Sequence, residues 1–374
     1  MVSFIRRWVP LTAILVGASA LLLVTDRAGA RRSMPAVAVL QQVSTPLLED
    51  AVRGMLDGLA EKGYVAGRTM TVRRFNAEGD LAQANAIARE IVGGPFDMVL
   101  TSSTPSLQAV ATANERGRPA GNRLVHVFAA VADPWSAGVG LDRGDPRVHP
   151  PHLVGYGSLA PVEATFRLLL EIRPTLKRVG AAHNPAESNS RRFMELARGC
   201  CQARGLRLIE VPVENSSGVV EAVQATISQG AEVVFVPGDT TVSSVIDSVV
   251  ATAAKAGLPV FSLTPGEPDR GTLFDVGYDF HEVGLLAGRL AGDILGGLDP
   301  TTVPIQATSQ AIPPRLTINL EAPGYDRTAW RIPEAILSQA TVVIGPDGRR
   351  DRPDAVLQGP FDEPHDPAVS AAHR

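Results

Sequence analysis

The stretch His183-Asn184-Pro185-Ala186-Glu187-Ser188-Asn189-Ser190 joins a predicted strand, residues 178–182, to a predicted helix that follows at once. The first turn of a helix leaves backbone N–H groups without intrahelical partners, and Asn189 and Ser190 add small polar side chains there. Such an end attracts anions, because the helix dipole adds to the unpaired donors. An ordinary helix N-cap has the same sequence pattern. Whether this junction is a ligand site therefore depends on whether the arrangement recurs in the chain.

The arrangement recurs twice. Residues 97–100 form an apolar predicted strand that ends in hydroxyls, with Thr104 at the predicted N-cap and Pro105 at the first helical position. Residues 233–236 form another, followed by the polar turn 237–241 and a helix. In open α/β sheets, ligands bind outside the carboxyl ends of the strands, which is where such junctions lie. We therefore expect the three junctions to form one ligand site.

Composition limits the class of protein. The 374 residues are 45% hydrophobic and 20% charged, enough to fill two ordinary domain cores. A net charge of −4 gives no electrostatic footprint for nucleic acid, so no nucleic-acid partner is expected. Cys200 and Cys201 are neighbours on a predicted helix, where consecutive side chains point apart. We interpret both as packing residues.

The N-terminus has the pattern of an export signal. Arg6 and Arg7 precede an uncharged, mainly apolar run, residues 8–25, and Ala-Gly-Ala at 28–30 offers a cleavage site. The run is long for a signal peptide and short for a membrane span. Residues 1–30 are therefore predicted to be a signal peptide or a membrane anchor. Both readings place the rest of the chain in the periplasm or at the outer face of the cytoplasmic membrane.

Strands and helices alternate along the chain in two similar runs. The first has predicted strands at 36–40, 69–75, 97–100 and 124–128. The second has them at 179–182, 206–211, 232–236 and 259–262, with helices beginning near 189, 219 and 242. Strands that alternate with helices form parallel sheets covered on both faces. The predicted fold is α/β, with two doubly wound parallel-sheet lobes joined by a hinge.

The last third of the chain is predicted to return to the first lobe, because a strand at 273–277 and a strong helix at 282–295 follow the second run. The late strand 311–320 is assigned there too. Beyond residue 345 the chain has few apolar residues. The predicted boundaries are 31–130 with 265–320 for lobe 1, 131–264 for lobe 2, 321–345 for a C-terminal extension packing on lobe 1, and 346–374 for a disordered tail.

Several short motifs, taken in order, resemble a known family. They are Gln41…Pro46, Ser103-Thr104-Pro105, Phe128…Val131…Asp133-Pro134, Asn184-Pro185…Glu187…Asn189-Ser190, Val236-Pro237…Asp239 and Gly277…Asp279. The family is that of the substrate-binding proteins of ABC transporters, of the tryptophan/tyrosine-binding type. The resemblance covers roughly residues 36 to 345. It implies the type 1 periplasmic binding fold, two lobes closing over a small ligand, often an aromatic amino acid, and delivery to a membrane permease.

A free amino acid presents a carboxylate and an ammonium, and burying either one unpaired is costly. Helix N-termini suit the carboxylate, and Asp133 or Asp239 suits the ammonium, although each also reads as a turn or cap residue. We interpret Trp135 as a packing residue, and stacking on an aromatic ligand is the less favoured alternative. Replacing Asp239 by Ala is expected to weaken binding with little loss of fold. The ten residues expected at the ligand are Gln41, Ser103, Thr104, Asp133, Glu187, Asn189, Ser190, Asp239, Thr240 and Asp279.

Three departures from the family pattern bear on the ligand. Family members commonly have Asn where this chain has Thr240, and Thr where it has Ala132. They often carry Glu-His where this chain has Ser44-Thr45. Because a hydrogen-bonding group inside a buried pocket can change ligand preference by orders of magnitude, the sequence leaves the ligand's identity open.

No motif indicates catalysis. The chain lacks a G-x-S-x-G nucleophile elbow, and its seven histidines show no H-x-x-x-H or similar metal spacing. His183 reads as a solvated junction residue. We expect a monomer without cofactor or metal that binds a small molecule and works with an ABC permease. The alternative that the sequence leaves open is a membrane-tethered sensor that uses the same cleft to control a signalling partner.

Overall fold

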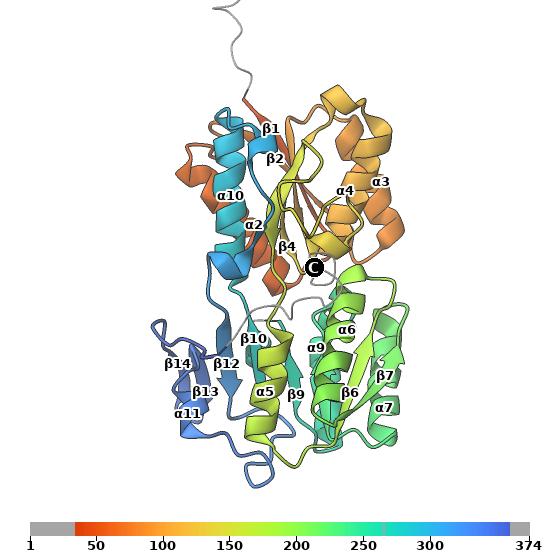
Figure 1. The fold of residues 1–374 in the computed structure, drawn as a ribbon, viewed down its shortest axis with the longest axis vertical. Coiled ribbons are helices and arrows are strands. Elements are labelled where there is room, and N and C mark those ends of the chain that lie inside the picture. The colour runs from red at the N-terminus through yellow and green to blue at the C-terminus, as the bar shows by residue number, and fades with distance from the viewer. Residues whose placement is uncertain (1–33, 265, 360–374) are drawn as a thin grey trace, which may run out of the picture. The chain divides into compact units, whose positions relative to one another are not determined.

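The structure, a computed structural model, describes residues 34–264 and 266–359 (Figure 1). The predicted signal or anchor and the last fifteen residues of the predicted tail lie outside these ranges. The residues from Ala36 onward form one compact unit. It contains two sheets, each with its own helices, which we call lobe 1 and lobe 2.

Lobe 1 is built on a sheet of six parallel strands in the order β11-β5-β4-β3-β1-β2. Their bounds are β1 Ala36–Gln41, β2 Thr71–Asn76, β3 Met98–Ser102, β4 Val125–Val131, β5 Leu153–Gly157 and β11 Gln306–Ala307. Helices α2 (Pro46–Glu61) and α10 (Phe280–Leu295) pack on one face, and α3 (Leu81–Gly93) and α4 (Thr104–Gly117) pack together on the other. The central strands are buried on both faces. Their sequences are therefore continuous apolar runs and do not alternate between apolar and polar residues.

Lobe 2 has an eight-stranded sheet in the order β14-β13-β12-β10-β9-β8-β6-β7. Its strands are β6 Arg178–His183, β7 Arg207–Pro212, β8 Val233–Val236, β9 Val260–Ser262, β10 Phe274–Gly277, β12 Arg315–Asn319, β13 Val342–Gly345 and β14 Gly348–Asp351. Its helices are α5 Val162–Ile172, α6 Ser188–Ala203, α7 Val219–Ser228, α8 Thr240–Ser243, α9 Ile246–Lys255 and α11 Glu334–Leu337. Helices α5 and α6 cover one face, and α7 and α9 the other. The predicted fold of two doubly wound lobes is confirmed.

The predicted lobe boundaries are wrong in four places. Strand β5 belongs to the first sheet, although it falls in the range assigned to lobe 2. Strands β10 and β12, assigned to lobe 1, extend the second sheet, where Phe274 of β10 stacks on Phe261 of β9 with ring centroids 5.4 Å apart. Strand β13 pairs with β12, so the C-terminal extension packs on lobe 2, and β14 is ordered strand in the predicted tail. Apolar strand patterns do not encode which sheet a strand joins.

Helix α10 does return to lobe 1 as predicted, and glycines bring it unusually close to α2. A Cβ atom added at Gly284 would lie 2.1 Å from the carbonyl oxygen of Ala51, and one at Gly288 would lie 2.1 Å from that of Met55. Gly54 on α2 is equally tight, 2.0 Å from the carbonyl oxygen of His281. Only a residue without a side chain permits this approach.

Three described segments connect the lobes. Residues 158–161 lead from β5 to α5, residues 278–279 from β10 to α10, and residues 308–314 from β11 to β12. The Ser158 hydroxyl lies 3.2 Å from that of Thr308, which ties two of these segments together. Connections that run side by side act as a hinge for lobe closure.

Candidate ligand-binding site

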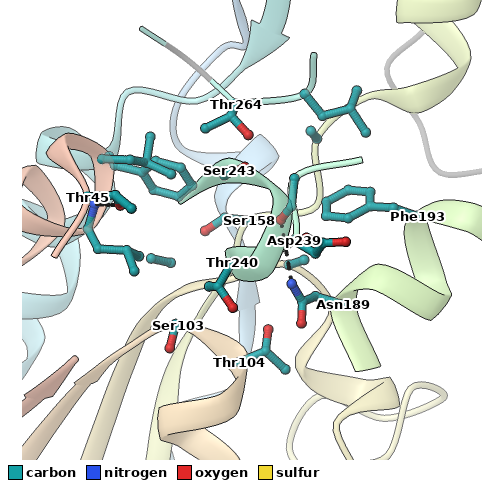
Figure 2. Close-up of a pocket in the computed structure, with 18 of the residues that line it drawn as sticks. Thr45, Ser103, Thr104, Ser158, Asn189, Phe193, Asp239, Thr240, Ser243 and Thr264 are labelled. Atoms are coloured by element: carbon teal, nitrogen blue, oxygen red, sulfur yellow. Dashed lines mark hydrogen bonds between the residues drawn. The ribbon is translucent and has the colours of Figure 1, made fainter. Parts of the chain in front are cut away.

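A cavity lies where the carboxyl ends of strands from both sheets face each other (Figure 2). The cavity is small, with about 60 Å³ open to the centre of a water-sized sphere. Its lining comes from both lobes and from the connecting segments. The residues are Thr45, Leu47, Leu48, Ser103, Thr104, Ala130, Ala132, Ser158, Ala160, Asn189, Phe193, Gly238, Asp239, Thr240, Ser243, Leu263, Thr264, Tyr278 and Phe280.

The lobe 1 side of the cavity contains the N-terminal end of α4. Ser103 caps this 14-residue helix by accepting a hydrogen bond from the Ser106 N–H at 3.4 Å, and Thr104 is its first residue. Both residues are buried and line the cavity. A helix end with hydroxyls beside it favours an anion, so a carboxylate fits here.

Two residues on this side have strained backbones. Ser103 has φ of 114° and Ala130 has φ of 55°, both in a region that residues with a side chain rarely adopt. Ala130 lies where the pairing of β4 with β5 shifts register between Phe128 and Val131. Residues with such backbone angles persist only where the surrounding structure imposes them, and they are frequent at ligand-binding sites. The strain therefore supports a functional role for this part of the cavity.

The lobe 2 side contains Asp239, whose side chain is fully buried. Its Oδ1 accepts a hydrogen bond from the Val242 N–H at 2.7 Å, and its Oδ2 accepts from the Asn184 N–H at 3.0 Å and the Ser190 hydroxyl at 2.9 Å. Burial, and then the nearby negative charge of Glu187, raise the pKa of Asp239 to about 7. A positive charge in the cavity would favour its ionised form.

Glu187 supports this wall from behind the cavity. Its two carboxylate oxygens accept from the backbone N–H groups of Thr240 and Thr241 at 2.9 and 3.0 Å, and from both hydroxyls at 2.6 Å. The same carboxylate accepts from the Asn189 amide nitrogen at 3.3 Å. Glu187 therefore fixes the orientation of Asn189 and the turn before α8.

Two buried polar atoms on the cavity wall have no hydrogen-bond partner among the described residues. They are Oδ1 of Asn189 and Oγ of Ser243. Because Glu187 receives the amide N–H₂ of Asn189, the acceptor end of that side chain is left for another donor. Buried polar atoms without partners are costly, so they mark where a ligand donor would be gained.

The remaining wall is apolar. Phe193, Tyr278, Phe280, Leu47, Leu48 and Leu263 line the cavity together with three alanines. Phe193 lies on the same face of α6 as Asn189, four residues earlier, and Figure 2 shows the two on one side of the cavity. An apolar part of a ligand would be buried against these rings.

Five of the ten predicted ligand residues line the cavity, and their contact with a ligand stays a prediction. They are Ser103, Thr104, Asn189, Asp239 and Thr240. Two more, Glu187 and Ser190, lie behind the wall and hydrogen-bond to residues that line it.

The other three predicted residues do not line the cavity, because their side chains have partners elsewhere. Gln41 donates from Nε2 to Glu49 at 2.7 Å beneath the β1–α2 loop. Asp279 caps α10 and pairs with Arg315 at 2.5 Å. Asp133 pairs with two arginines.

Trp135 and His183 also lie outside the cavity. The guanidinium of Arg143 stands 5.5 Å from the centre of the Trp135 ring, which packs in a small cluster of lobe 1. Packing was the favoured interpretation of this residue. His183 Nε2 faces Glu210 at 3.7 Å, and burial lowers the pKa of this imidazole.

Sequence reasoning missed the lining residues on the connecting segments and on helix faces. Ser158 and Tyr278 belong to connections that carry no local motif. Phe193 had a usable signal, since it lies one helical turn after Asn189. No cluster of acidic, His or Cys side chains suited to a metal ion occurs among residues 34–264 and 266–359.

Comparison with known proteins identifies relatives of the whole folded region. A sequence model of the family described as "ABC transporter substrate binding protein" matches residues 36–344. A tyrosine-binding protein of Clostridioides difficile strain R20291 is 25% identical over 269 residues, which are 72% of this chain and 75% of that protein.

Two solved structures are similar to this protein. Each match covers 83% of this chain and the whole of the other chain. One is a conserved domain protein of Vibrio cholerae, with 31% identity and a TM-score of 0.75. The other is an ABC domain of Streptococcus pneumonia in complex with L-Trp, with 25% identity and a TM-score of 0.74.

Proposed function

The chain belongs to the ABC transporter substrate-binding protein family, and from this premise we propose that its cavity binds a free amino acid for uptake through a membrane permease. An aromatic side chain is favoured. The support from relatives is that one is named a tyrosine-binding protein and another holds L-Trp. Proteins of this family bind small molecules, work with ABC permeases and are extracytoplasmic.

The observation that carries the proposal is that one cavity between the lobes offers separate places for two opposite charges and an apolar group. The N-terminal end of α4, with Ser103 and Thr104, would receive the carboxylate. Oδ1 of Asn189 would accept from the ammonium, with the buried Asp239 carboxylate as its counter-charge. The rings of Phe193 and Phe280 would enclose the side chain.

The size of the void agrees with this ligand class. A cavity this small favours a single small molecule over a peptide. Residues of both lobes line it, so opening of the lobes would widen the entrance for a ligand.

The sensor alternative shares the cavity and differs in what happens to the N-terminus. Among the described residues no helix is both long and apolar enough to span a bilayer. Mass spectrometry of the exported protein separates the two roles. Cleavage near residue 30 supports free transport, and an intact N-terminus in the membrane fraction supports tethering.

Calorimetric titration of residues 31–374 with tryptophan, tyrosine, phenylalanine and leucine tests the ligand class. Two analogues of tryptophan that each lack one charge, tryptamine and indole-3-propionate, test the two polar subsites separately. We expect binding of aromatic amino acids and at least about tenfold weaker binding of both analogues. Equal affinity for tryptophan and indole-3-propionate would remove the ammonium subsite, and no heat with any amino acid would refute the proposed class.

A further inference from the structure

An ion pair joins the two lobes beside the cavity. Asp133 follows β4 of lobe 1 and caps the short helix η2 (Pro134–Ser136), while Arg192 lies in the first turns of α6 in lobe 2. The Arg192 Nε is 3.1 Å from Oδ2 of Asp133, an ion pair whose geometry is not that of a hydrogen bond. The Asp133 side chain is 0% exposed and that of Arg192 is 14% exposed, so the pair is largely removed from water.

Asp133 is held on the lobe 1 side by two further groups. Its Oδ1 accepts from the Ser136 N–H at 3.3 Å, and its Oδ2 also pairs with Arg143, which belongs to the loop before β5. Arg192 in turn pairs with Glu195 of its own helix at 3.0 Å. The carboxylate is thus fixed within lobe 1, and only its contact with Arg192 crosses between the lobes.

The ion pair adjoins the cavity on both sides. Ala132, directly before Asp133, lines the cavity, and so does Phe193, directly after Arg192. Asn189, one helical turn before Arg192, lines it as well. A contact that fixes the start of α6 against lobe 1 therefore also fixes the two α6 residues that face the void.

We propose that Asp133 and Arg192 form a latch that holds the lobes closed and so sets how long a ligand stays in the cavity. Opening at the hinge segments separates these side chains because they belong to different lobes. When the lobes open, Asp133 keeps Arg143 and the Ser136 N–H but loses one of the two cations that compensate the burial of its carboxylate. The closed state gains this compensation whether or not a ligand is present, and the effect on ligand retention rests on the proposed function.

The distance between the lobes in the absence of ligand tests the latch on its own. Cysteines introduced at the exposed Asn85 of α3 and Glu221 of α7 would carry one spin label on each lobe. The native Cys200 and Cys201 are buried, and burial raises the pKa of each thiol to about 12, so they resist labelling. Double electron–electron resonance then gives the populations of closed and open lobes.

We expect a closed population in the parent protein that is reduced at least about fivefold by Arg192→Gln, with Arg192→Lys in between. Arg143→Gln is the comparison variant, because it removes a cation from the same carboxylate but leaves the contact with Arg192, and it should not open the lobes. Asp133→Asn, which keeps an acceptor for the Ser136 N–H, should act like Arg192→Gln. Circular dichroism confirms that each variant is folded.

The latch is refuted if the parent shows no closed population without ligand, if Arg192→Gln leaves the distances unchanged, or if Arg143→Gln opens the lobes equally. With a ligand that binds, Arg192→Gln should also raise its dissociation rate about tenfold or more, with little change in the association rate. If no amino acid binds and the distances still respond to Arg192→Gln, the proposed ligand class fails while the latch stands.

Discussion

Affinity for an amino acid should rise with pH through neutrality because of Asp239. Burial and Glu187 hold the pKa of Asp239 at about 7, so the carboxylate is about one-tenth ionised at pH 6 and about nine-tenths ionised at pH 8. The ligand ammonium is positive throughout this range and favours only the ionised form. We therefore expect affinity to increase about tenfold from pH 6 to pH 8, equivalent to about 1.4 kcal/mol.

The stability of the ligand-free protein should change in the opposite direction. The pKa of Asp239 in the folded state lies above the ordinary value of 3.8. The folded state therefore holds its proton more tightly than the unfolded state, and stability from this group falls as pH rises from about 4 to about 7. Burial also lowers the pKa of His183, the last residue of β6.

Calorimetric titration with tryptophan at pH 6, 7 and 8 measures the effect. Asp239→Asn should abolish the rise, and indole-3-propionate, which has no ammonium, should not show it. The three hydrogen bonds of Asp239 also correct the expectation that replacing it with Ala spares the fold. We expect Asp239→Ala to cost about 1–3 kcal/mol of stability, read by urea denaturation. An affinity that is flat with pH, or equally steep in Asp239→Asn, would refute the role of this carboxylate.

Three further predictions follow from single residues. Gly288→Ala forces a Cβ against the carbonyl of Met55 and should cost about 1–3 kcal/mol in urea denaturation; an unchanged midpoint would contradict the α2–α10 contact. Ala130→Gly relieves the backbone at φ 55° and should raise stability by about 1 kcal/mol, unless that strain is absent. Asn189→Ala should weaken amino-acid binding at least about tenfold by calorimetry, whereas the exposed Asn85→Ala on α3 should leave it unchanged.

The sequence determined the class of fold and the family. Apolar runs such as 97–100 and 233–236 alternate with amphipathic helices, and this local period is enough to require parallel sheets covered on both faces. The resemblance in the ordered motifs is confirmed by the family match over residues 36–344. Polar residues at strand ends, Ser103, Thr104 and Asp239 among them, line the cavity, because the ends of parallel strands share one edge of a sheet.

Only the tertiary structure decided the partners of groups that lie far apart in the sequence. Asp133, one of the two carboxylates that the sequence suggested for a ligand ammonium, pairs with Arg192, which lies 59 residues later in the chain. The composition of strand β10 would allow it to join either sheet. In the structure it lies beside β9 in lobe 2, where Phe274 stacks on Phe261. Local pattern records whether a residue is buried. It does not record which neighbour satisfies a buried charge or ring, because that depends on long-range packing.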